Sequence, residues 1–300
     1  MGYDIEIVTP GGTKIRFATY NIQYGFGQDG AYDLGRIADA VSDADIICMQ
    51  EVTTNWKACH HDHQPDVLSA RLNRHMAYAP GYEVDSSHTD TRGRVVNKRR
   101  GFGNLVLSRW PIVYSRAHSL PRPLLEQVAD THTDLPRCVL ETVIDTPRVP
   151  LRIMSVHLSH QSQAQRLRQV GVLRALVNSL PHESRMWNPA RAAQDPWSEG
   201  RPEPPVVGST ILAGDFNFQP ADPEYAAMLE PVDGQAMVDA WRVTHSAGER
   251  ATTCVESDGS QTTLDYAFVT ADMTGSLSGA SVRNDTKASD HFPLLLELDI

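Results

Sequence analysis

One ten-residue segment restricts the fold of this chain more than any other: Ile211-Leu212-Ala213-Gly214-Asp215-Phe216-Asn217-Phe218-Gln219-Pro220. Its apolar start predicts a short buried strand, which Gly214 and the polar residues after it bring to an end. Because side chains two apart on a strand share a face, Asp215 and Asn217 should project together while Phe216 packs behind them. A carboxylate beside an amide can bind a metal ion, orient a water molecule or accept its proton. The same residues also suit a strand that enters an Asx turn, so the rest of the chain must decide.

Polar side chains also stand at the ends of most other apolar runs. Asn21 follows the alternating pattern of residues 14–20, Glu51 ends the run that begins at Asp45, and His157 follows residues 151–156. The full set is Asn21, Glu51, Asn104, His157, Asp215, Asn217, Asp265, Asp290 and His291. Each residue alone has an ordinary structural explanation. Together they indicate one site, because open sheets place ligands beyond the ends of their strands.

The acids in this set point to a metal ion. Glu51 follows a strongly apolar strand, and a carboxylate buried there without a partner would be costly. Several carboxylates at one edge of a sheet require a hard cation, and oxygen ligands suit Mg²⁺ or Mn²⁺. For Glu51 considered alone, a side chain that emerges into solvent is the competing interpretation.

The segments between these residues predict alternating strands and helices. Apolar spacing of i, i+3, i+4 and i+7 predicts a helix over 34–41, and the longest helical pattern covers 161–180. Further strands are predicted over 138–144, 263–269 and 294–298. The polar segment 82–100 is expected to be a flexible connection. Residues 182–209 are rich in proline and predict a long loop or insertion. With no convincing linker elsewhere, we expect residues 1–300 to form a single domain.

The charge of the chain disfavours one class of partner. Its 27 basic and 37 acidic residues give a net charge of −10. This is the wrong sign for attraction to a nucleic-acid backbone in general, although a local basic groove is compatible with an acidic total. The only basic run, Lys98-Arg99-Arg100, is either a solvated loop or a contact for an anion.

Cysteine usage and the N-terminus suggest a compartment. The four cysteines are scattered and form no C-x-x-C pair, which favours a reducing environment. The first residues lack the basic region and apolar core of a signal peptide, and no segment approaches the length of a membrane span. We therefore expect a cytoplasmic protein with no membrane span.

The ordered motifs resemble the endonuclease/exonuclease/phosphatase superfamily, whose members include DNase I-like and exonuclease III-like enzymes. The motifs are Thr19-Tyr20-Asn21, Met49-Gln50-Glu51-Val52, Gly103-Asn104 with Leu107-Ser108-Arg109, Ser155-Val156-His157-Leu158, Gly214-Asp215-Phe216-Asn217, Leu264-Asp265-Tyr266 and Ser289-Asp290-His291. Each motif is weak alone, but the ordered set covers nearly the whole chain. The resemblance implies an α/β fold in four layers, with two mixed β-sheets packed face to face and helices on the outside. It also implies a metal-dependent phosphoesterase site at one edge.

The same resemblance assigns a metal site and an attacking water. Glu51 would be the principal Mg²⁺ ligand, with Asp290 close to the metal ion and Asn21 in support. Asp215 would orient and deprotonate the water that attacks phosphorus, and Asn217 would position that water or a phosphate oxygen. Whether Asp215 or a histidine is the true base stays open at this stage.

The resemblance also assigns the residues that surround the phosphate. His291, paired with Asp265, would face the phosphate as an imidazolium, since an adjacent carboxylate favours the charged form. His157 would contact the phosphate from another side. Asn104 and Arg137 are the further candidates for substrate-phosphate contact. A cation and a charged histidine suit in-line attack, which builds negative charge on the phosphate oxygens and the leaving group.

The substrate is less constrained than the chemistry. Leu264-Asp265-Tyr266 lacks the Cys-Asp-Arg signature of inositol phosphatases, and Val52-Thr53 replaces the Thr-Lys usual in abasic-site endonucleases. Together with the net charge of −10, this favours a phosphodiester of a small molecule or lipid headgroup. A magnesium-dependent nuclease acting on DNA or RNA is the alternative. A binding module without catalysis is a third hypothesis, which the complete set of acids, amides and histidines disfavours.

Overall fold

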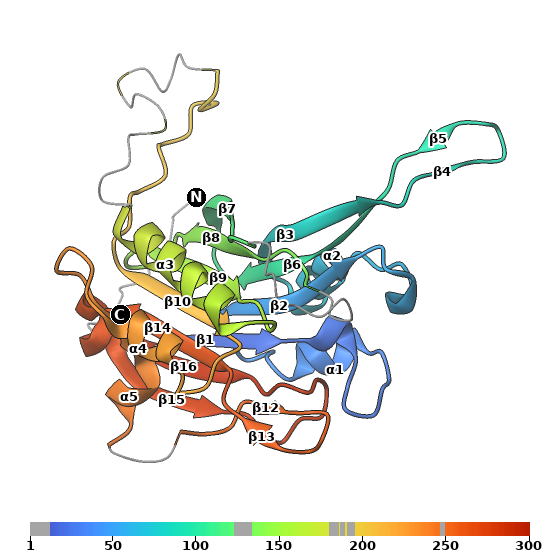
Figure 1. Ribbon diagram of the computed structural model, residues 1–300. Coiled ribbons are helices and arrows are strands. Elements are labelled where there is room, and N and C mark those ends of the chain that lie inside the picture. The colour runs from blue at the N-terminus through green and yellow to red at the C-terminus, as the bar shows by residue number, and fades with distance from the viewer. Residues whose placement is uncertain (1–12, 123–133, 180–185, 187–189, 191–195, 247–249) are drawn as a thin grey trace, which may run out of the picture.

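Two six-stranded mixed sheets form the centre of the molecule (Figure 1). The structure is a computed structural model, and it describes residues 13–122, 134–179, 186, 190, 196–246 and 250–300. The first sheet has the order β15 (Leu277–Val282), β16 (Leu294–Asp299), β1 (Lys14–Asn21), β2 (Ile46–Thr54), β6 (Arg99–Ser108) and β3 (His75–Asp85). The second has the order β11 (Met237–Asp239), β14 (Asp265–Thr270), β10 (Thr210–Asp215), β9 (Leu151–His157), β8 (Cys138–Ile144) and β7 (Ile112–Ser119).

The middle of each sheet is a parallel pair of strands. β1 runs parallel to β2, and β9 runs parallel to β10, whereas their other neighbours are antiparallel. The carboxyl ends of a parallel pair meet at one edge of the sheet, so the residues that end these strands come together there. Residues Asn21, His157 and Asp215 end β1, β9 and β10, respectively.

Three apolar clusters hold four layers together. One lies between the sheets and contains residues of both, such as Phe17 of β1 and Ile153 of β9. A second joins the first sheet to α1 (Leu34–Asp39) and α2 (Gln64–Leu72). The third joins the second sheet to α3 (Gln163–Ser179) and α4 (Pro223–Leu229). The four-layer sandwich with outer helices is therefore confirmed.

Alternation along each strand explains how these layers form. In β1, Ile15 and Phe17 face the other sheet, while Ala18 and Tyr20 face the helices. Because both faces of the central strands are covered, these strands are apolar on both sides, as expected for buried sheets. The inward-facing positions of β1 continue through Thr19 to Asn21, so the interior becomes polar toward one edge.

The remaining elements among the described residues are short. They are α5 (Ala240–Thr244), the pair β12 (Cys254–Val255) and β13 (Gln261–Thr262), the pair β4 (His88–Thr89) and β5 (Val95–Val96), and 3-10 helices at Gln23–Gly25, Lys57–Cys59 and Ala271–Ser276. None of the described helices is long and apolar enough to cross a lipid bilayer.

Residues 82–100 are not the flexible connection that their composition suggested. β3 and β6 extend as a paired ribbon beyond the sandwich, and β4 and β5 lie near its tip (Figure 1). Pairs such as Val84 with Arg100 supply the hydrogen-bonded ladder. Most of the ribbon residues beyond Tyr82 are exposed, and the ribbon is polar. Its sequence therefore lacks the apolar pattern that predicts a strand.

β7 and β15 arise from segments for which the sequence predicted no strand, and both lie at sheet edges, where burial is partial. In the predicted loop 182–209, residues 182–185, 187–189 and 191–195 lie outside the described residues. The described part from 196 to 209 contains turns but neither helix nor strand.

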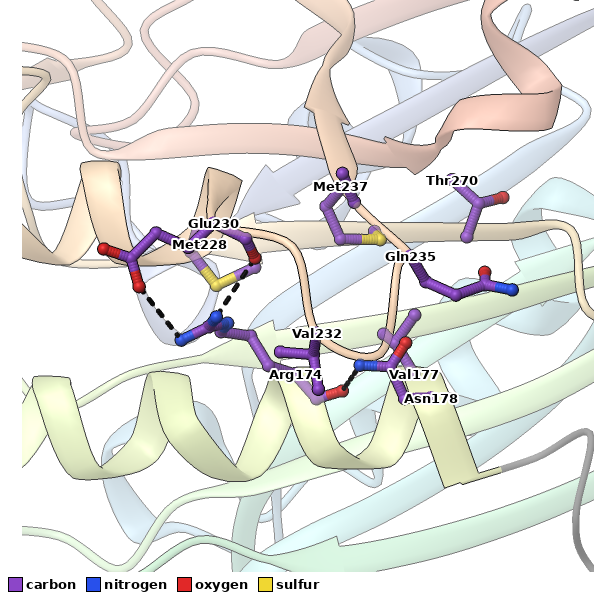
Figure 2. A pocket seen from close by; sticks show the side chains of 10 residues that line it. Arg174, Val177, Asn178, Met228, Glu230, Val232, Gln235, Met237 and Thr270 are labelled. Carbon is purple, nitrogen blue, oxygen red and sulfur yellow. Dashed lines mark hydrogen bonds and ion pairs between the residues drawn. The ribbon is translucent and has the colours of Figure 1, made fainter.

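The packing of α3 against α4 and the following loop leaves one small cavity (Figure 2). Its volume is about 10 Å³, roughly the space for one water molecule. Arg174 of α3 closes one side by donating to the carbonyl oxygen of Glu230 at 3.0 Å, and Asn178 donates to the carbonyl oxygen of Arg174. None of the site residues predicted from the sequence lines this cavity.

Candidate active site

A cleft of about 570 Å³ lies at the edge where the central strands end. Its walls include eight of the residues predicted from the sequence: Asn21, Glu51, Arg137, His157, Asp215, Asn217, Asp290 and His291. Asp265 is fully buried behind His291. The residues come from both sheets and from the segment before β16, so folding assembles the group from distant parts of the chain.

Asp215 is the centre of this group. Its Oδ2 accepts a hydrogen bond from Asn21 Nδ2 at 2.9 Å, and its Oδ1 accepts one from the backbone N–H of Asn217 at 2.9 Å. The Nε2 atoms of His157 and His291 lie 3.3 and 3.7 Å from Oδ2. Burial raises the pKa of Asp215, against the opposing effect of the His291 charge. A carboxylate with a raised pKa, flanked by two imidazoles, is suited to accept a proton.

The side chains of Asn21 and Asn217 are both engaged around Asp215. Asn21 Oδ1 accepts from the backbone N–H of Gln23, and its Nδ2 is used by Asp215. Asn217 Nδ2 donates to the carbonyl oxygen of Leu158 at 3.1 Å, and its backbone adopts a left-handed φ of 52°. Asn tolerates this conformation better than most residues, which explains the amide at this turn. In this arrangement Asn21 orients Asp215.

Gly214 allows Asp215 to reach its position. A Cβ atom at Gly214 would lie 1.8 Å from the carbonyl oxygen of Val156 on the neighbouring strand β9. No side chain fits in such a contact. The glycine in the Gly-Asp-Phe-Asn segment therefore lets β10 approach β9 closely where His157 and Asp215 meet.

His291 is held as a charged imidazolium. Its Nδ1–H donates to Asp265 Oδ2 at 2.8 Å. Asp265 lies opposite Asp215 in the antiparallel pair of β14 and β10, so both carboxylates face the same imidazole. Burial alone would lower the pKa of His291, but the charges of Asp265 and Asp215 outweigh it and raise the pKa well above 6.5.

His157 is held in the opposite state. Arg137 Nη1 lies 2.8 Å from His157 Nδ1, and a guanidinium can only donate, so Nδ1 must be the acceptor. The proton of the neutral ring is then on Nε2, which faces Asp215. Burial lowers the pKa of His157 well below 6.5, and the positive charge of Arg137 lowers it further. The sequence predicted two phosphate-binding histidines but not their opposite charge states.

Glu51 reaches the cleft through an irregularity in β2. The register of β2 with β6 shifts between Met49 and Val52, and Glu51 has a left-handed φ of 60°. Its side chain is 15% exposed. Burial raises the pKa of Glu51 to about 7, with Asp290 and Asp215 adding to the rise and Arg137 opposing it. Burial likewise raises the pKa of Asp290, whose Oδ1 accepts from Ser289 Oγ at 3.1 Å.

The carboxylates of the cleft suit a divalent cation. In the described part of the chain, no three His, Cys, Asp or Glu side chains form a ready-made metal cluster. Mg²⁺ is usually bound by one or two carboxylates together with water and substrate phosphate. Glu51 and Asp290 are two carboxylates in one cleft, both with raised pKa values because they are largely removed from water with too little positive charge nearby. These residues fit a magnesium site completed by water and phosphate.

Asn104, like Asp265, is a predicted site residue that does not line the cleft. Its Nδ2 donates to the carbonyl oxygens of Cys138 at 2.9 Å and Ser155 at 3.1 Å, which both belong to the opposite sheet. Its side chain is buried between the sheets. Asn104 therefore lies behind the site, and its amide is occupied by backbone groups.

Several lining residues were not singled out by the sequence. They are Gln23, Tyr24, Phe102, Leu135, His160, Cys254, Glu256 and Leu264. Tyr24 and Phe102 have ring centroids 6.0 Å apart, and the Arg137 guanidinium lies over the Phe102 ring. Phe102 stands between two glycines in Gly101-Phe102-Gly103, and an aromatic residue in this setting is the sequence feature that could have identified it as a lining residue. Arg100 of the basic run lies over the Trp56 ring and is not among the lining residues.

Solved structures share this fold. An endonuclease/exonuclease/phosphatase from Beutenbergia cavernae DSM 12333 is 22% identical with a TM-score of 0.62, covering 96% of this chain and 72% of that chain. One from Bacteroides vulgatus is 18% identical with a TM-score of 0.64, covering 96% and 99%. A mannosyl-6-phosphatase from Bacteroides thetaiotaomicron VPI-5482 is 18% identical with a TM-score of 0.57, covering 95% and 100%. At these identities the likeness shows the fold alone.

The sequence comparisons assign a family. A search of the curated proteins finds no match. The model of the Endonuclease/Exonuclease/phosphatase family matches residues 18–291, a range that contains every strand-end residue described above. The chain therefore belongs to the endonuclease/exonuclease/phosphatase family.

Proposed function

We propose that this protein is a divalent-metal-dependent phosphoesterase that hydrolyses a phosphodiester by in-line attack of an activated water. One observation carries the proposal: a buried carboxylate, Asp215, lies between a charged histidine, His291, and a neutral one, His157. General acid–base chemistry needs groups in distinct protonation states at the same pH, and this arrangement supplies them.

Asp215 is the proposed base for the attacking water. Its raised pKa makes it a better proton acceptor than an exposed aspartate, while the hydrogen bonds from Asn21 and Asn217 fix its direction. A base held in one orientation removes part of the entropic cost of reaction. In this proposal Asn21 and Asn217 act by orienting Asp215 and its water.

The two histidines are the proposed phosphate ligands. His291, charged through its pairing with Asp265, would offset the negative charge that develops on the phosphate oxygens. His157 would offer its Nε2–H as a neutral donor, because Arg137 occupies Nδ1. Arg137 thus contributes to phosphate binding through the orientation of His157.

Glu51 and Asp290 would hold Mg²⁺ or Mn²⁺ beside Asn21. When bound, such an ion adds positive charge that offsets the charge on the phosphate oxygens and the leaving group. The carboxylates lose their proton more readily next to a cation, so ion binding would also return the pKa of Glu51 from about 7 toward its usual range.

The favoured substrate is a phosphodiester of a small molecule or lipid headgroup. A cleft of about 570 Å³ falls within the usual size of small-molecule sites, roughly 300–1,000 Å³. The net charge of −10 opposes attraction of a long polyanion. The mannosyl-6-phosphatase of the same fold supports small phosphorylated molecules as a class, although it shares only 18% of its sequence.

A nuclease is the second candidate. The observation in its favour is the ribbon of β3 and β6, where Arg99 and Arg100 are exposed at the end of the Lys98–Arg100 run. Arg100 and Trp56 together offer a cation and an aromatic ring, which single-stranded nucleic acids commonly contact. A substrate panel separates this candidate from the first.

The test compares hydrolysis of bis-p-nitrophenyl phosphate, p-nitrophenyl phosphate and supercoiled plasmid, each with Mg²⁺, Mn²⁺ or EDTA. Cleavage of the diester while the plasmid stays intact supports the small-molecule phosphodiesterase. Nicking of the plasmid favours the nuclease, and preference for the monoester makes the protein a phosphatase. Retained metal-dependent turnover in Glu51→Ala would contradict the proposed metal site. No turnover in any arm would support a binding module instead.

A further inference from the structure

Four neutral polar side chains are buried between the two sheets, directly behind the cleft. They are Thr19, Gln50, Asn104 and Ser155, each at most 2% exposed. Three of them stand just before a site residue in sequence: Thr19 before Asn21, Gln50 before Glu51 and Ser155 before His157. Elsewhere the same interior layer contains a large apolar cluster. Polar groups in such a layer are costly unless they are hydrogen-bonded, so their partners are informative.

Their hydrogen bonds cross from one sheet to the other. Gln50 Nε2 donates to Ser155 Oγ at 3.1 Å and to Thr19 Oγ1 at 3.2 Å. Asn104 Nδ2 donates to the carbonyl oxygens of Ser155 and Cys138. Gln50 and Asn104 belong to the first sheet, while Ser155 and Cys138 belong to the second. Ser155 thus receives a hydrogen bond from each of the two amides.

Gln50 also lies in the irregular part of β2. Met49 pairs with Leu105, and the next aligned pair is Val52 with Gly103, so Gln50 and Glu51 together face the single residue Asn104. This is the geometry of a β-bulge, which frequently redirects a side chain beside an active site. Met49 and Val52 both belong to the outer cluster, whereas Gln50 points between the sheets. Glu51 is the extra residue of the bulge, so its side chain does not follow the alternation of side chains along the strand.

The bulge has a conformational cost that something must offset. Glu51 has φ of 60°, a left-handed conformation that side chains other than glycine, Asn and Asp rarely adopt. Such conformations persist where the surroundings over-determine them. The hydrogen bonds of Gln50 to Ser155 and Thr19 hold the residue immediately before the strained position.

We propose that Gln50 and Ser155 are positioning residues that hold the bulge so that the Glu51 carboxylate points into the cleft. The inference rests on the proposed function, because Glu51 is there the principal ligand of the cation. The same link fixes the distance between Glu51 on the first sheet and His157 on the second. Glu51 Oε1 lies 3.9 Å from His157 Nε2. Neither Gln50 nor Ser155 lines the cleft.

The test uses Gln50→Met, which keeps the length of the side chain and removes its hydrogen bonds. Thr142→Val is the matched control. Thr142 is also fully buried in the second sheet, and its hydroxyl donates to the carbonyl oxygen of Ile153, within that sheet. Ile153 is four residues before His157 on β9, roughly 13 Å from it. For each protein, Mn²⁺ affinity is measured by electron paramagnetic resonance, together with the thermal midpoint and kcat and KM for bis-p-nitrophenyl phosphate.

Gln50→Met should weaken Mn²⁺ binding about 10-fold or more, as expected when the support of a metal ligand is lost, and should lower kcat more than it raises KM. Thr142→Val should lower the thermal midpoint while Mn²⁺ affinity and kcat stay within about twofold of wild type. Ser155→Ala, a smaller change that tests the other side of the link, should shift Mn²⁺ affinity in the same direction as Gln50→Met.

The inference is overturned if both Gln50→Met and Ser155→Ala bind Mn²⁺ like wild type and lose only stability. In that outcome the polar layer only joins the sheets, and the proposed function stands. If Gln50→Met does not fold, Ser155→Ala alone decides. A wild-type protein that neither binds Mn²⁺ nor hydrolyses any phosphoester contradicts the proposed function, and the inference falls with it.

Discussion

Two buried histidines in this cleft lie near the same carboxylate, and yet His291 is charged while His157 is neutral. The difference comes from the residue that is hydrogen-bonded to Nδ1 of each imidazole. That residue is Asp265 for His291 and Arg137 for His157. The sequence indicated the Asp265 pair through its motif. It did not indicate that Arg137, which is 20 positions from His157, would reach that imidazole, because this contact depends on the pairing of β8 with β9.

The raised pKa of Glu51 makes the stability of the metal-free protein depend on pH. The folded pKa of about 7 exceeds the ordinary glutamate value of 4.5, so the metal-free native state binds more protons than the unfolded state between these values. By linkage, the contribution of Glu51 to stability falls as pH rises from 4.5 to 7. Glu51→Gln should therefore stabilise the metal-free protein at pH 8, by up to about 3 kcal/mol, and have little effect at pH 4.5.

Urea unfolding in EDTA at the two pH values measures this difference. The same variant should lose the stabilisation that Mg²⁺ or Mn²⁺ gives the wild type, since ligands of the native state raise its stability. Equal stability of wild type and Glu51→Gln at pH 8 would contradict the raised pKa.

At the scale of elements, the inward face of the central strands changes from apolar to polar toward one edge. β1 shows this in Phe17, Thr19 and Asn21, and β9 in Ile153, Ser155 and His157. Alternation with period two is readable in a sequence, so these strands and their terminal residues were predictable. The bulge at Glu51 was not, because it depends on the register of β2 with β6. The paired ribbon of β3 and β6 was missed because its exposed residues carry no apolar pattern.

Gly214 stands where the backbones of β10 and β9 leave no room for a side chain. Because a Cβ atom would lie 1.8 Å from Val156 O, Gly214→Ala should force β10 away from β9. We expect stability to fall by roughly 2 kcal/mol or more and kcat to fall about 100-fold, since displacements near 1 Å can cost that much in rate.

Gly171→Ala is the control for this substitution. Gly171 is an exposed residue of α3, with nothing within 4 Å of the added Cβ, and alanine there should stabilise the helix by about 1 kcal/mol. Chemical unfolding and diester hydrolysis measure both variants. A Gly214→Ala protein with normal kcat would show that the close approach of β10 to β9 is not needed.

Across the whole molecule, a buried network that stabilises the packing of the layers lies away from the candidate active site. At the start of β9, the end opposite His157, buried Arg152 donates to Glu141 Oε1 at 2.8 Å and to the carbonyl oxygen of Leu176 in α3. His118 and Arg116 also contact Glu141. This network joins the second sheet to its outer helix, and it favours the ionised form of Glu141, whose pKa is lowered by these partners in spite of burial.

Removing the charge of Arg152 tests whether this network affects stability without affecting kcat. Arg152→Met leaves a buried carboxylate with fewer partners and frees carbonyl oxygens of α3, so the free energy of unfolding should fall by about 3 kcal/mol. Well below the unfolding midpoint, kcat should stay within about twofold of wild type. Guanidinium unfolding and steady-state kinetics at one temperature measure the two effects. A large loss of kcat in the folded variant would show that the network also supports the site.

In the proposed function, Asp215 and a divalent cation act together on a phosphoester. The most direct measurement is the rate of bis-p-nitrophenyl phosphate hydrolysis by wild type and Asp215→Asn, with Mg²⁺ or Mn²⁺ and with EDTA. Asn keeps the shape of Asp and cannot accept the proton, so the rate should fall by at least ~100-fold while the thermal midpoint stays near that of wild type. EDTA should abolish the wild-type rate. Turnover that survives both EDTA and Asp215→Asn would contradict this account.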